Sequence, residues 1–416
     1  MYVVVSLIEV RTLNNKNFYL LCIVLLINSI ASSTTWLVLP VYFKEYGATE
    51  VDVGALMATL TIIGALLALP AGRISDRIGR KPILVFSLLG YASSWSIIAL
   101  ARAGASIHWF YISMIARGPF TLLGSAVTAF IADLFEPEKR GSMLGIRQAV
   151  GMAGSIIGPV VSGLLIATFS YNGYFLFAAS TSLISLFLAF ILLKESKADA
   201  LSIRKYFRKS MNFKIPTLRF PQLHPRTILT ENKDLVKFYL ARLFAVGQRL
   251  YGTILPILYT SIIGLDITEI TFMASAHSVL SMVADPILGR FSDKAGRKPI
   301  LYAGSLISAL VPILYTQIHT FNEVFLIRAF SIVATSATMI AGNALLADLV
   351  PESHRGLGIN LFSFLSSILG SILSIVGGII VIQYGWSSVL YVAAVISIIG
   401  VPILFTVPER KKGIVK

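Results

Sequence analysis

The chain has 416 residues, of which 56% are hydrophobic and only 13% are charged. A soluble protein of this length carries about 25% charged residues, so this chain cannot cover itself with water-facing side chains, and a bilayer must be its solvent. In lipid every backbone polar group must be satisfied internally, and long apolar runs without an alternation over about ten residues predict helices, not barrel strands.

A membrane-spanning helix needs about 20 apolar residues. The N-terminal run follows Arg11 and Lys16 as in a signal peptide, but it extends through residue 43, so we expect it to be retained as the first span. The sequence then predicts twelve spans, at residues 18–43, 51–71, 82–103, 108–131, 142–168, 173–193, 236–262, 268–288, 300–318, 321–347, 357–383 and 386–407.

The distribution of basic residues predicts the orientation of these spans. With a cytoplasmic N-terminus, the inner segments hold about 29 of the 35 Lys and Arg residues, and the outer loops hold only Lys44 and Arg102. We therefore expect a multi-pass protein of the cell membrane with both termini cytoplasmic. Its net charge of +15 then indicates contact with anionic membrane lipid and not with nucleic acid. The single cysteine, Cys22, excludes a disulfide within the chain.

The longest connection, residues 195–234, divides the chain into an N-terminal six-helix half (1–194) and a C-terminal six-helix half (235–416). It is a basic linker. Residues 201–211 form either an amphipathic helix on the inner leaflet or part of a mobile connection. The prolines at 216, 221 and 225 indicate that the second part of the linker is not helical.

The two halves repeat one another. The charged loop at residues 72–82, Gly-Arg-Ile-Ser-Asp-Arg-Ile-Gly-Arg-Lys-Pro, returns almost unchanged at residues 289–299. The Asp-to-Arg-Gly segment that ends the fourth span (132–141) returns after the tenth (347–356). Such a parallel repeat places a substrate path where the halves meet, near the bilayer midplane.

These features resemble the major facilitator superfamily, whose motif A is Gly-x-x-x-Asp-Arg-x-Gly-Arg-Lys between the second and third helices. The resemblance covers residues 17–409. It implies an all-α integral membrane fold of twelve helices in two six-helix repeats, and a monomeric secondary transporter that works by alternating access. It implies no cofactor, no metal and no enzymatic activity.

The resemblance also implies a cytoplasmic gate, in which Arg80 pairs with Asp133 while Asp76 contacts the start of the eleventh helix. Asp76 and Arg80 are four residues apart, which permits a pair on one helical turn, and we expect Gly79 and Gly296 to adopt positive φ. The alternative is that these charges only anchor the inner face. The predicted gate residues are Gly72, Asp76, Arg77, Gly79, Arg80, Asp133 and Arg140 in the first half, and Gly289, Asp293, Arg297, Asp348 and Arg355 in the second.

The fifth span carries a second motif, similar to motif C of the drug:proton antiporter families. Its residues are Gly145, Gly154, Gly158, Pro159 and Gly163, with Ser162 where those families have a further glycine. Small residues let membrane helices approach closely, and Pro159 can kink the helix; plain packing is the alternative for each glycine alone.

Charged and polar residues inside the spans are the candidates for a substrate cavity, because exposure of charge to lipid is costly. We select Asn28, Arg117, Gln248 and Arg249, against the alternative of structural pairing between helices. Arg242 lies nearer the inner end, where we expect it to snorkel to the surface. Aromatic residues such as Tyr91 and Trp95 either line a pocket or pack.

Two departures from the family matter for coupling. The fourth span has Ser113 where an arginine is usual, with Arg117 one turn further in, and the first span holds no carboxylate. Asp285 is the carboxylate that lies within a span away from the motif ends, and His277 precedes it by two turns. These two residues are the candidates for proton coupling; an ion pair of Asp285 with a basic residue of the motif is the alternative.

The sequence therefore predicts a secondary active transporter, in which protons drive the efflux of a small hydrophobic or amphipathic compound. The alternative is proton-coupled transport of a polar or anionic metabolite, a sugar or a carboxylate, with Arg117 and Arg249 as clamps. No metal-ligand cluster, nucleotide loop or nucleophile constellation supports an enzyme. The expected partners are the small-molecule substrate, protons and membrane lipid.

Overall fold

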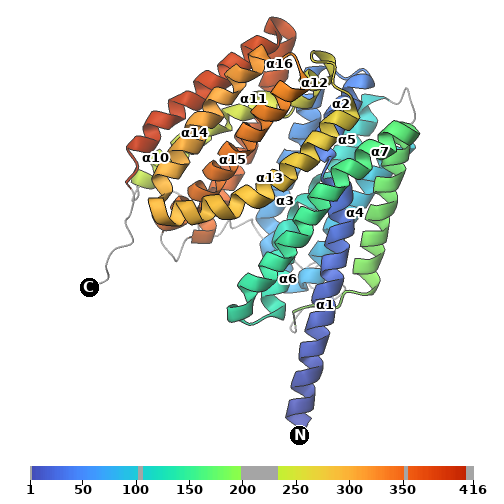
Figure 1. Cartoon of the computed structure of the whole chain (residues 1–416). Helices are drawn as coiled ribbons and strands as arrows, with labels where there is room; N and C mark the ends of the chain where they lie inside the picture. The colour runs from blue at the N-terminus through green and yellow to red at the C-terminus, as the bar shows by residue number, and fades with distance from the viewer. Residues whose placement is uncertain (1, 102–105, 198–232, 351–354, 409–416) are drawn as a thin grey trace, which may run out of the picture. The chain divides into compact units, whose positions relative to one another are not determined.

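The computed structural model describes residues 2–101, 106–197, 233–350 and 355–408, and these residues are almost entirely helical (Figure 1). None of the described residues lies in a β-strand. The prediction of an all-α membrane protein is therefore confirmed. The predicted amphipathic helix at 201–211 and most of the central linker lie outside the described residues.

The chain forms two compact units. The first consists of Met1–Leu39 and Thr59–Leu218, and the second of Pro40–Ala58 and Arg219–Lys416. In chain order the α-helices are α1 (Tyr2–Ser32), α2 (Thr35–Glu45), α3 (Glu50–Ile78), α4 (Arg80–Leu100), α5 (Ile107–Arg117), α6 (Leu123–Leu134), α7 (Pro137–Ile191), α10 (Lys233–Ala245), α11 (Arg249–Gly252), α12 (Leu255–Ser261), α13 (Ile267–Ala295), α14 (Arg297–Leu314), α15 (Phe321–Leu349) and α16 (Arg355–Phe405).

In the first unit, α7 packs against α1 and α4, and α4 packs against α5. The core between them is apolar, with Leu21, Leu88, Val127 and Phe130 fully buried. Their burial holds together helices whose outer faces are as apolar as lipid.

In the second unit, α14 packs against α15 and α16, and α10 and α11 pack against α16. The segment Pro40–Ala58 belongs to this unit because its backbone approaches α16 closely. A methyl group at Gly54 would lie 2.5 Å from the carbonyl oxygen of Ser374, and one at Gly378 would lie 2.5 Å from that of Glu50. Only glycine permits this contact.

Nine helical stretches of the described chain are long and apolar enough to cross a membrane. Two of them, α7 and α16, each join two helices across a non-helical residue, Ser170 (φ 59°) and Gly385 (φ 81°). Both residues lie at the short turns that the span boundaries predict. With α10–α12 as a further, interrupted span, the described residues account for the twelve predicted spans.

Three spans are interrupted where the sequence predicted continuous helices. The first span divides between Ser32 and Thr35. The fourth passes through a 3₁₀ turn at Gly118–Leu122, directly after Arg117. The seventh passes through a 3₁₀ turn at Val246–Gln248, directly before Arg249. A short 3₁₀ stretch within a helix often marks a hinge or a functional position. Both of these 3₁₀ turns adjoin an arginine in the middle of a span.

Candidate functional site

The turn between α3 and α4 is a single glycine. Gly79 has φ +102° and ψ 174°, a backbone conformation that essentially only glycine adopts. The corresponding residue of the second unit, Gly296, has φ +97° and ψ 154°. The prediction of positive φ at both glycines is thus confirmed, and each turn starts a new helix with an arginine, Arg80 or Arg297.

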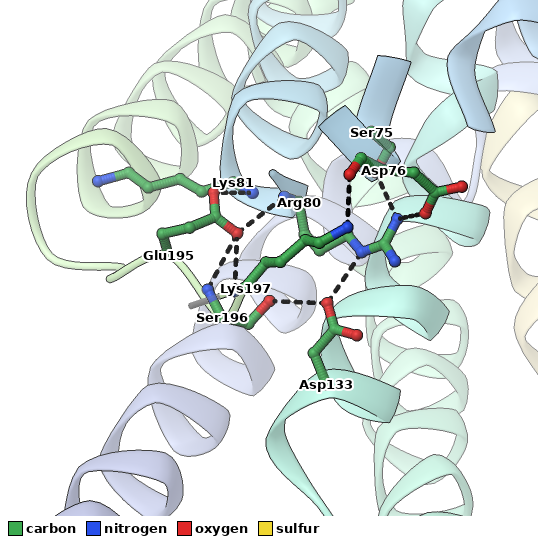
Figure 2. Close-up of polar contacts among 8 residues, drawn as sticks. All are labelled: Ser75, Asp76, Arg80, Lys81, Asp133, Glu195, Ser196 and Lys197. Carbon is green, nitrogen blue, oxygen red and sulfur yellow. Dashed lines mark hydrogen bonds and ion pairs between the residues drawn. The ribbon is translucent and has the colours of Figure 1, made fainter. Parts of the chain in front are cut away.

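Arg80 is the centre of a group of charges at the expected cytoplasmic end of the first unit (Figure 2). Its Nη1 donates to Asp76 Oδ1 at 2.7 Å and to Ser75 Oγ at 3.0 Å, and its Nε donates to Asp133 Oδ2 at 2.9 Å. Arg80 therefore ties the end of α3 to the end of α6. The sequence predicted both carboxylates as partners of Arg80 but not Ser75.

Glu195, which the sequence analysis did not select, completes this group. Its Oε1 accepts from the backbone N–H of Arg80 at 2.8 Å, and its Oε2 accepts from that of Lys81 at 3.1 Å. The carboxylate thus caps the first turn of α4, where a negative charge is favoured by the helix dipole and where Gly79 has no side chain for the purpose. We call Asp76, Arg80, Asp133 and Glu195 the first charge cluster.

The two residues after Glu195 extend the same network (Figure 2). Ser196 Oγ donates to Asp133 Oδ2 at 3.4 Å, and the Lys197 ammonium donates to the backbone carbonyl of Asp76. The beginning of the central linker is therefore bound to α3, α4 and α6. The only signal in the sequence is a carboxylate two residues after the sixth span. Such a position does not indicate which residues the carboxylate contacts.

The second unit has a smaller counterpart, the second charge cluster of Arg297 and Asp348. The guanidinium of Arg297 forms an ion pair with Asp348 and donates from Nη1 to the backbone carbonyl of Ala344 at 2.9 Å. Asp293 is exposed. The contact that the family implies between Asp76 and the start of the eleventh helix stays a prediction, as does the role of Asp293 in the gate.

The remaining predicted gate residues do not belong to the two charge clusters defined above. Arg140 Nε donates to the backbone carbonyl of Phe135 at 3.0 Å, which closes the end of α6. Arg77 is exposed. Gly72 lies within α3 and Gly289 within α13, and Arg355 is the first residue of α16.

The glycine motif of α7 faces α1. A methyl group at Gly154 would collide with Ser29, and one at Gly158 would collide with the carbonyl of Ile30 and with Ser33. A methyl group at Gly145, at the other end of the motif, would have no neighbouring atom within 4 Å. The motif therefore makes a close helix contact at Gly154 and Gly158 and none at Gly145.

The polar end of the same contact is a small hydrogen-bond network. Ser162 Oγ donates to the Gly158 carbonyl at 2.7 Å and shares a hydrogen bond of 3.1 Å with Thr34 Oγ1, which also bonds to the Tyr174 hydroxyl at 2.7 Å. Pro159 and Gly163 lie buried beside this network. The serine that replaces a family glycine thus links α7 to the break between α1 and α2.

Arg117, at the end of α5, is only 1% exposed within the first unit. Its Nε donates to Ser94 Oγ and its Nη1 to Thr35 Oγ1, both at 2.9 Å. Its guanidinium carbon lies 4.2 Å from the ring centroid of Trp95 and 5.0 Å from that of Tyr91. Arg117 forms no ion pair with any described residue, and its Nη2 has no hydrogen-bond partner.

Asn28 on α1 belongs to the same unit and is 2% exposed. Neither atom of its amide has a hydrogen-bond partner. A buried polar group without a partner is rare and costly in a native protein, so Asn28 and Arg117 are two places where the first unit has unused hydrogen-bonding capacity.

The predicted cavity residues of the second unit differ in exposure. Arg249 is exposed. Its aliphatic stem lies against Gly370, where a methyl group would be 3.2 Å from Arg249 Cγ. Gln248 Nε2 donates to the Ser308 carbonyl at 3.0 Å, which anchors the 3₁₀ turn to α14. Among these four candidates, therefore, only Asn28 and Arg117 are enclosed.

The prediction that Arg242 snorkels to the surface is wrong. Its Nη1 donates to the backbone carbonyl of Thr338 at 3.1 Å, and its guanidinium lies against Gly342 and 5.7 Å from the ring centroid of Phe362. The absence of a side chain at Gly342 leaves room for the guanidinium inside the unit, so Arg242 does not need to reach the end of the helix.

Asp285 and His277 lie eight residues apart on α13 and have different environments. His277 is buried, and its Nε2 lies 3.2 Å from the Phe325 carbonyl. Asp285 forms no ion pair with a described residue, and its Oδ1 is buried without a hydrogen-bond partner. The alternative of an ion pair between Asp285 and a motif residue is therefore not supported.

Comparison with known proteins gives the family. The family model described as Major Facilitator Superfamily matches residues 21–237 and 238–416. The chain is 28% identical over 378 residues to "Multidrug resistance protein MdtG" of Enterobacter lignolyticus (86% of this chain, 84% of the relative). It is 27% identical over 376 residues to the protein of the same name from Salmonella typhimurium (86% of each).

Solved structures of similar fold superpose on most of the chain. A POT family transporter in complex with a thioalcohol-conjugated peptide superposes with a TM-score of 0.74 at 14% identity, covering 94% of this chain and 96% of that one. A bacterial homologue of the human lysosomal transporter Spinster superposes with a TM-score of 0.72 at 12% identity, covering 95% and 97%. At such identity these structures show the fold alone.

Proposed function

The chain belongs to the major facilitator superfamily and is a secondary transporter of the membrane, and from this premise we propose that it exports a small hydrophobic or amphipathic compound in exchange for protons. Its family consists of transporters and not of enzymes. The single observation that carries the proposal is the similarity to multidrug resistance proteins along 86% of the chain.

The packing of α7 on α1 supports the same proposal. The motif that resembles that of drug:proton antiporters is used for a close helix contact, because Gly154 and Gly158 lie directly against the backbone and side chains of α1. Small residues at such a contact allow helices to approach closely and to hold a defined distance.

The two charge clusters supply the proposed gate. In this account the halves 1–194 and 235–416 rock around a central site, joined by the linker 195–234, and both termini are cytoplasmic. Arg80 and Arg297 hold helix ends together on that side, and one chain is sufficient for the cycle. Membrane lipid with anionic head groups contacts the basic loops.

A second candidate is transport of a polar or anionic metabolite, such as a sugar or a carboxylate. The observation that favours it is Arg117, a guanidinium that is fully buried without an acidic partner among the described residues. A hydrophobic drug alone offers nothing to that charge.

The experiment that tests the proposed function is uptake into proteoliposomes under an imposed pH gradient. Fluorescent amphipathic compounds of negative, zero and positive charge are added outside vesicles with an acidic lumen. Antiport predicts accumulation of at least one compound above the level in vesicles without a gradient, and a protonophore abolishes it. Uptake that equals that of protein-free vesicles for every compound contradicts the proposal.

A further inference from the structure

The membrane-spanning part of the first half contains positive charge and no negative charge. Between residues 18 and 193, acidic residues occur only in loops or at span ends, as Glu45, Glu50, Asp52, Asp76, Asp133, Glu136 and Glu138. Arg117 lies in the middle of the fourth span. No carboxylate of these spans is therefore placed to neutralise it.

The hydrogen bonds of Arg117 leave one end of the guanidinium unused. Nε and Nη1 each donate to a hydroxyl, of Ser94 and Thr35 respectively. A hydroxyl accepts a hydrogen bond but carries no charge, so these bonds fix the orientation of the side chain without neutralising it. Nη2, with both of its hydrogens, is buried and has no partner. An anionic oxygen would both neutralise the guanidinium charge and accept a hydrogen bond from Nη2.

The aromatic residues around Arg117 are already occupied by a cation. The guanidinium lies 4.2 Å from the centroid of Trp95 and 5.0 Å from that of Tyr91, within the range of cation–π attraction. Tyr91 also stacks on Phe120, with centroids 4.1 Å apart. A cationic substrate would have to compete with Arg117 for these rings and would be repelled by it, whereas an anion meets neither obstacle.

Asn28 is a second group with unused hydrogen-bonding capacity in the first span. It lies one turn before Ser32, the last residue of α1, and Thr35, whose hydroxyl accepts from Arg117, begins α2 directly after the break in this span. Its unpartnered amide offers two donors and one acceptor. The first unit thus contains two residues with unused donors, Asn28 and Arg117, and both are at least nine-tenths buried.

We propose that the transported compound is an organic anion, a carboxylate or sulfonate on an apolar or aromatic body, and that its anionic group binds Arg117 Nη2 with Asn28 as a second contact. This rests on the proposed function, because it names the substrate class of that transporter. In the present conformation Arg117 is enclosed. The 3₁₀ turn that directly follows it, Gly118–Leu122, is the hinge at which the site opens.

The proposal is tested with three probes that share one ring system and differ in charge. They are 2-naphthalenesulfonate, the neutral 2-naphthalenesulfonamide, and trimethyl(2-naphthylmethyl)ammonium. Binding to the purified full chain in detergent is measured by thermal stabilisation and by quenching of tryptophan fluorescence. We expect the sulfonate to bind about tenfold or more tightly than the other two, since hydrogen bonds to charged groups are the stronger ones.

Variants test whether Arg117 causes the preference for the sulfonate over the other two probes. Arg117→Gln should weaken sulfonate binding about tenfold or more and leave the sulfonamide nearly unchanged, whereas Arg117→Lys should retain part of the preference. Arg242→Gln, which changes a half-buried arginine of the second unit, is the control and should keep the preference. If Arg117→Gln does not fold, Asn28→Ala and the comparison of probes on the unmodified protein still decide.

Several outcomes overturn the proposal. These are tighter or equal binding of the ammonium compound, undiminished sulfonate binding by Arg117→Gln, and no binding of any probe, which would mean that water alone satisfies Arg117. Any of these leaves proton-driven export of another compound intact. Conversely, sulfonate binding without pH-driven flux in vesicles contradicts the proposed function and not the anion site.

Discussion

Arg80 and Arg117 are arginines of one unit with different surroundings. Arg80 bonds to two carboxylates, Asp76 and Asp133, and its charge is balanced at a helix end. Arg117 bonds to two hydroxyls and two aromatic faces, and its charge is not balanced. A balanced charge suits a contact that holds helices together, and an unbalanced one suits a ligand that brings the opposite charge.

The cap formed by Glu195 predicts a measurable loss of stability. Glu195→Gln keeps the shape but removes the charge and one acceptor, so one N–H at the start of α4 loses its partner. We expect a cost of about 1 kcal/mol and a lower Tm by thermal unfolding in detergent. Glu138→Gln, an exposed residue in the first turn of α7, is the control. Equal Tm values for the two variants would contradict the cap.

Gly79 provides a second test at the same place. Gly79→Ala and Gly385→Ala both force alanine into a backbone region reserved for glycine, at a cost of about 1–3 kcal/mol each. At Gly79 the methyl group also meets the Glu195 carboxylate, whereas at Gly385 it has no neighbour within 4 Å. The Tm should therefore fall further for Gly79→Ala, and a larger fall for Gly385→Ala would refute the close approach of Glu195.

At the scale of helices, the glycines of α7 set its distance from α1. At Gly158 a Cβ alone would collide with the Ile30 carbonyl oxygen and with Ser33 Oγ, so Gly158→Val overpacks this contact, at a cost of about 1–3 kcal/mol. We expect loss of transport in vesicles together with a lower Tm. Gly145→Val, on the same helix and in the same motif, faces open space and should transport as the unmodified protein does. Comparable loss in both variants would mean that the contact is unimportant.

The helices also show what the sequence can predict. The turns at Ser170 and Gly385 follow from the limited length of a span, which is local information. The interruptions at Gly118–Leu122 and Val246–Gln248 do not, because they depend on distant contacts: a methyl group at Gly118 would collide with Ile63, and one at Gly247 would lie 2.8 Å from Ile396.

The contacts of the candidate site are likewise of two kinds, those that the sequence predicts and those that depend on tertiary structure. The spacing of four residues predicted Asp76 beside Arg80, and the resemblance to the family implied Asp133 as its partner. Glu195 is 115 residues away from Arg80 and belongs to no motif, so no local pattern indicates it. The direction of Arg242 was mispredicted because the space at Gly342 is a tertiary feature.

At the scale of the whole molecule, the repeat produces two units with unequal charge clusters. In the first, the linker residues Glu195, Ser196 and Lys197 reinforce Arg80. In the second, Arg297 forms an ion pair with Asp348 and donates to the backbone carbonyl of Ala344. The start of the linker therefore contacts the first cluster directly.

Coupling is a property of the complete cycle, and Asp285 is its candidate. Asp285→Asn cannot release a proton, so we expect it to lose pH-driven uptake while it retains exchange of substrate for substrate. Asp234→Asn, which changes a surface residue beside Lys237, should retain both. Both activities are measured with tracer in proteoliposomes, and normal pH-driven uptake by Asp285→Asn would exclude this residue from coupling.

The central claim, exchange of substrate for protons, is tested most directly by recording proton movement. Vesicles with trapped pyranine, equal pH on both sides, and valinomycin with potassium to hold the membrane potential receive 2-naphthalenesulfonate outside. Antiport predicts that the lumen becomes more alkaline as the compound enters, and that protein-free vesicles show no such change. Entry of the compound with an unchanged or falling lumenal pH would contradict it.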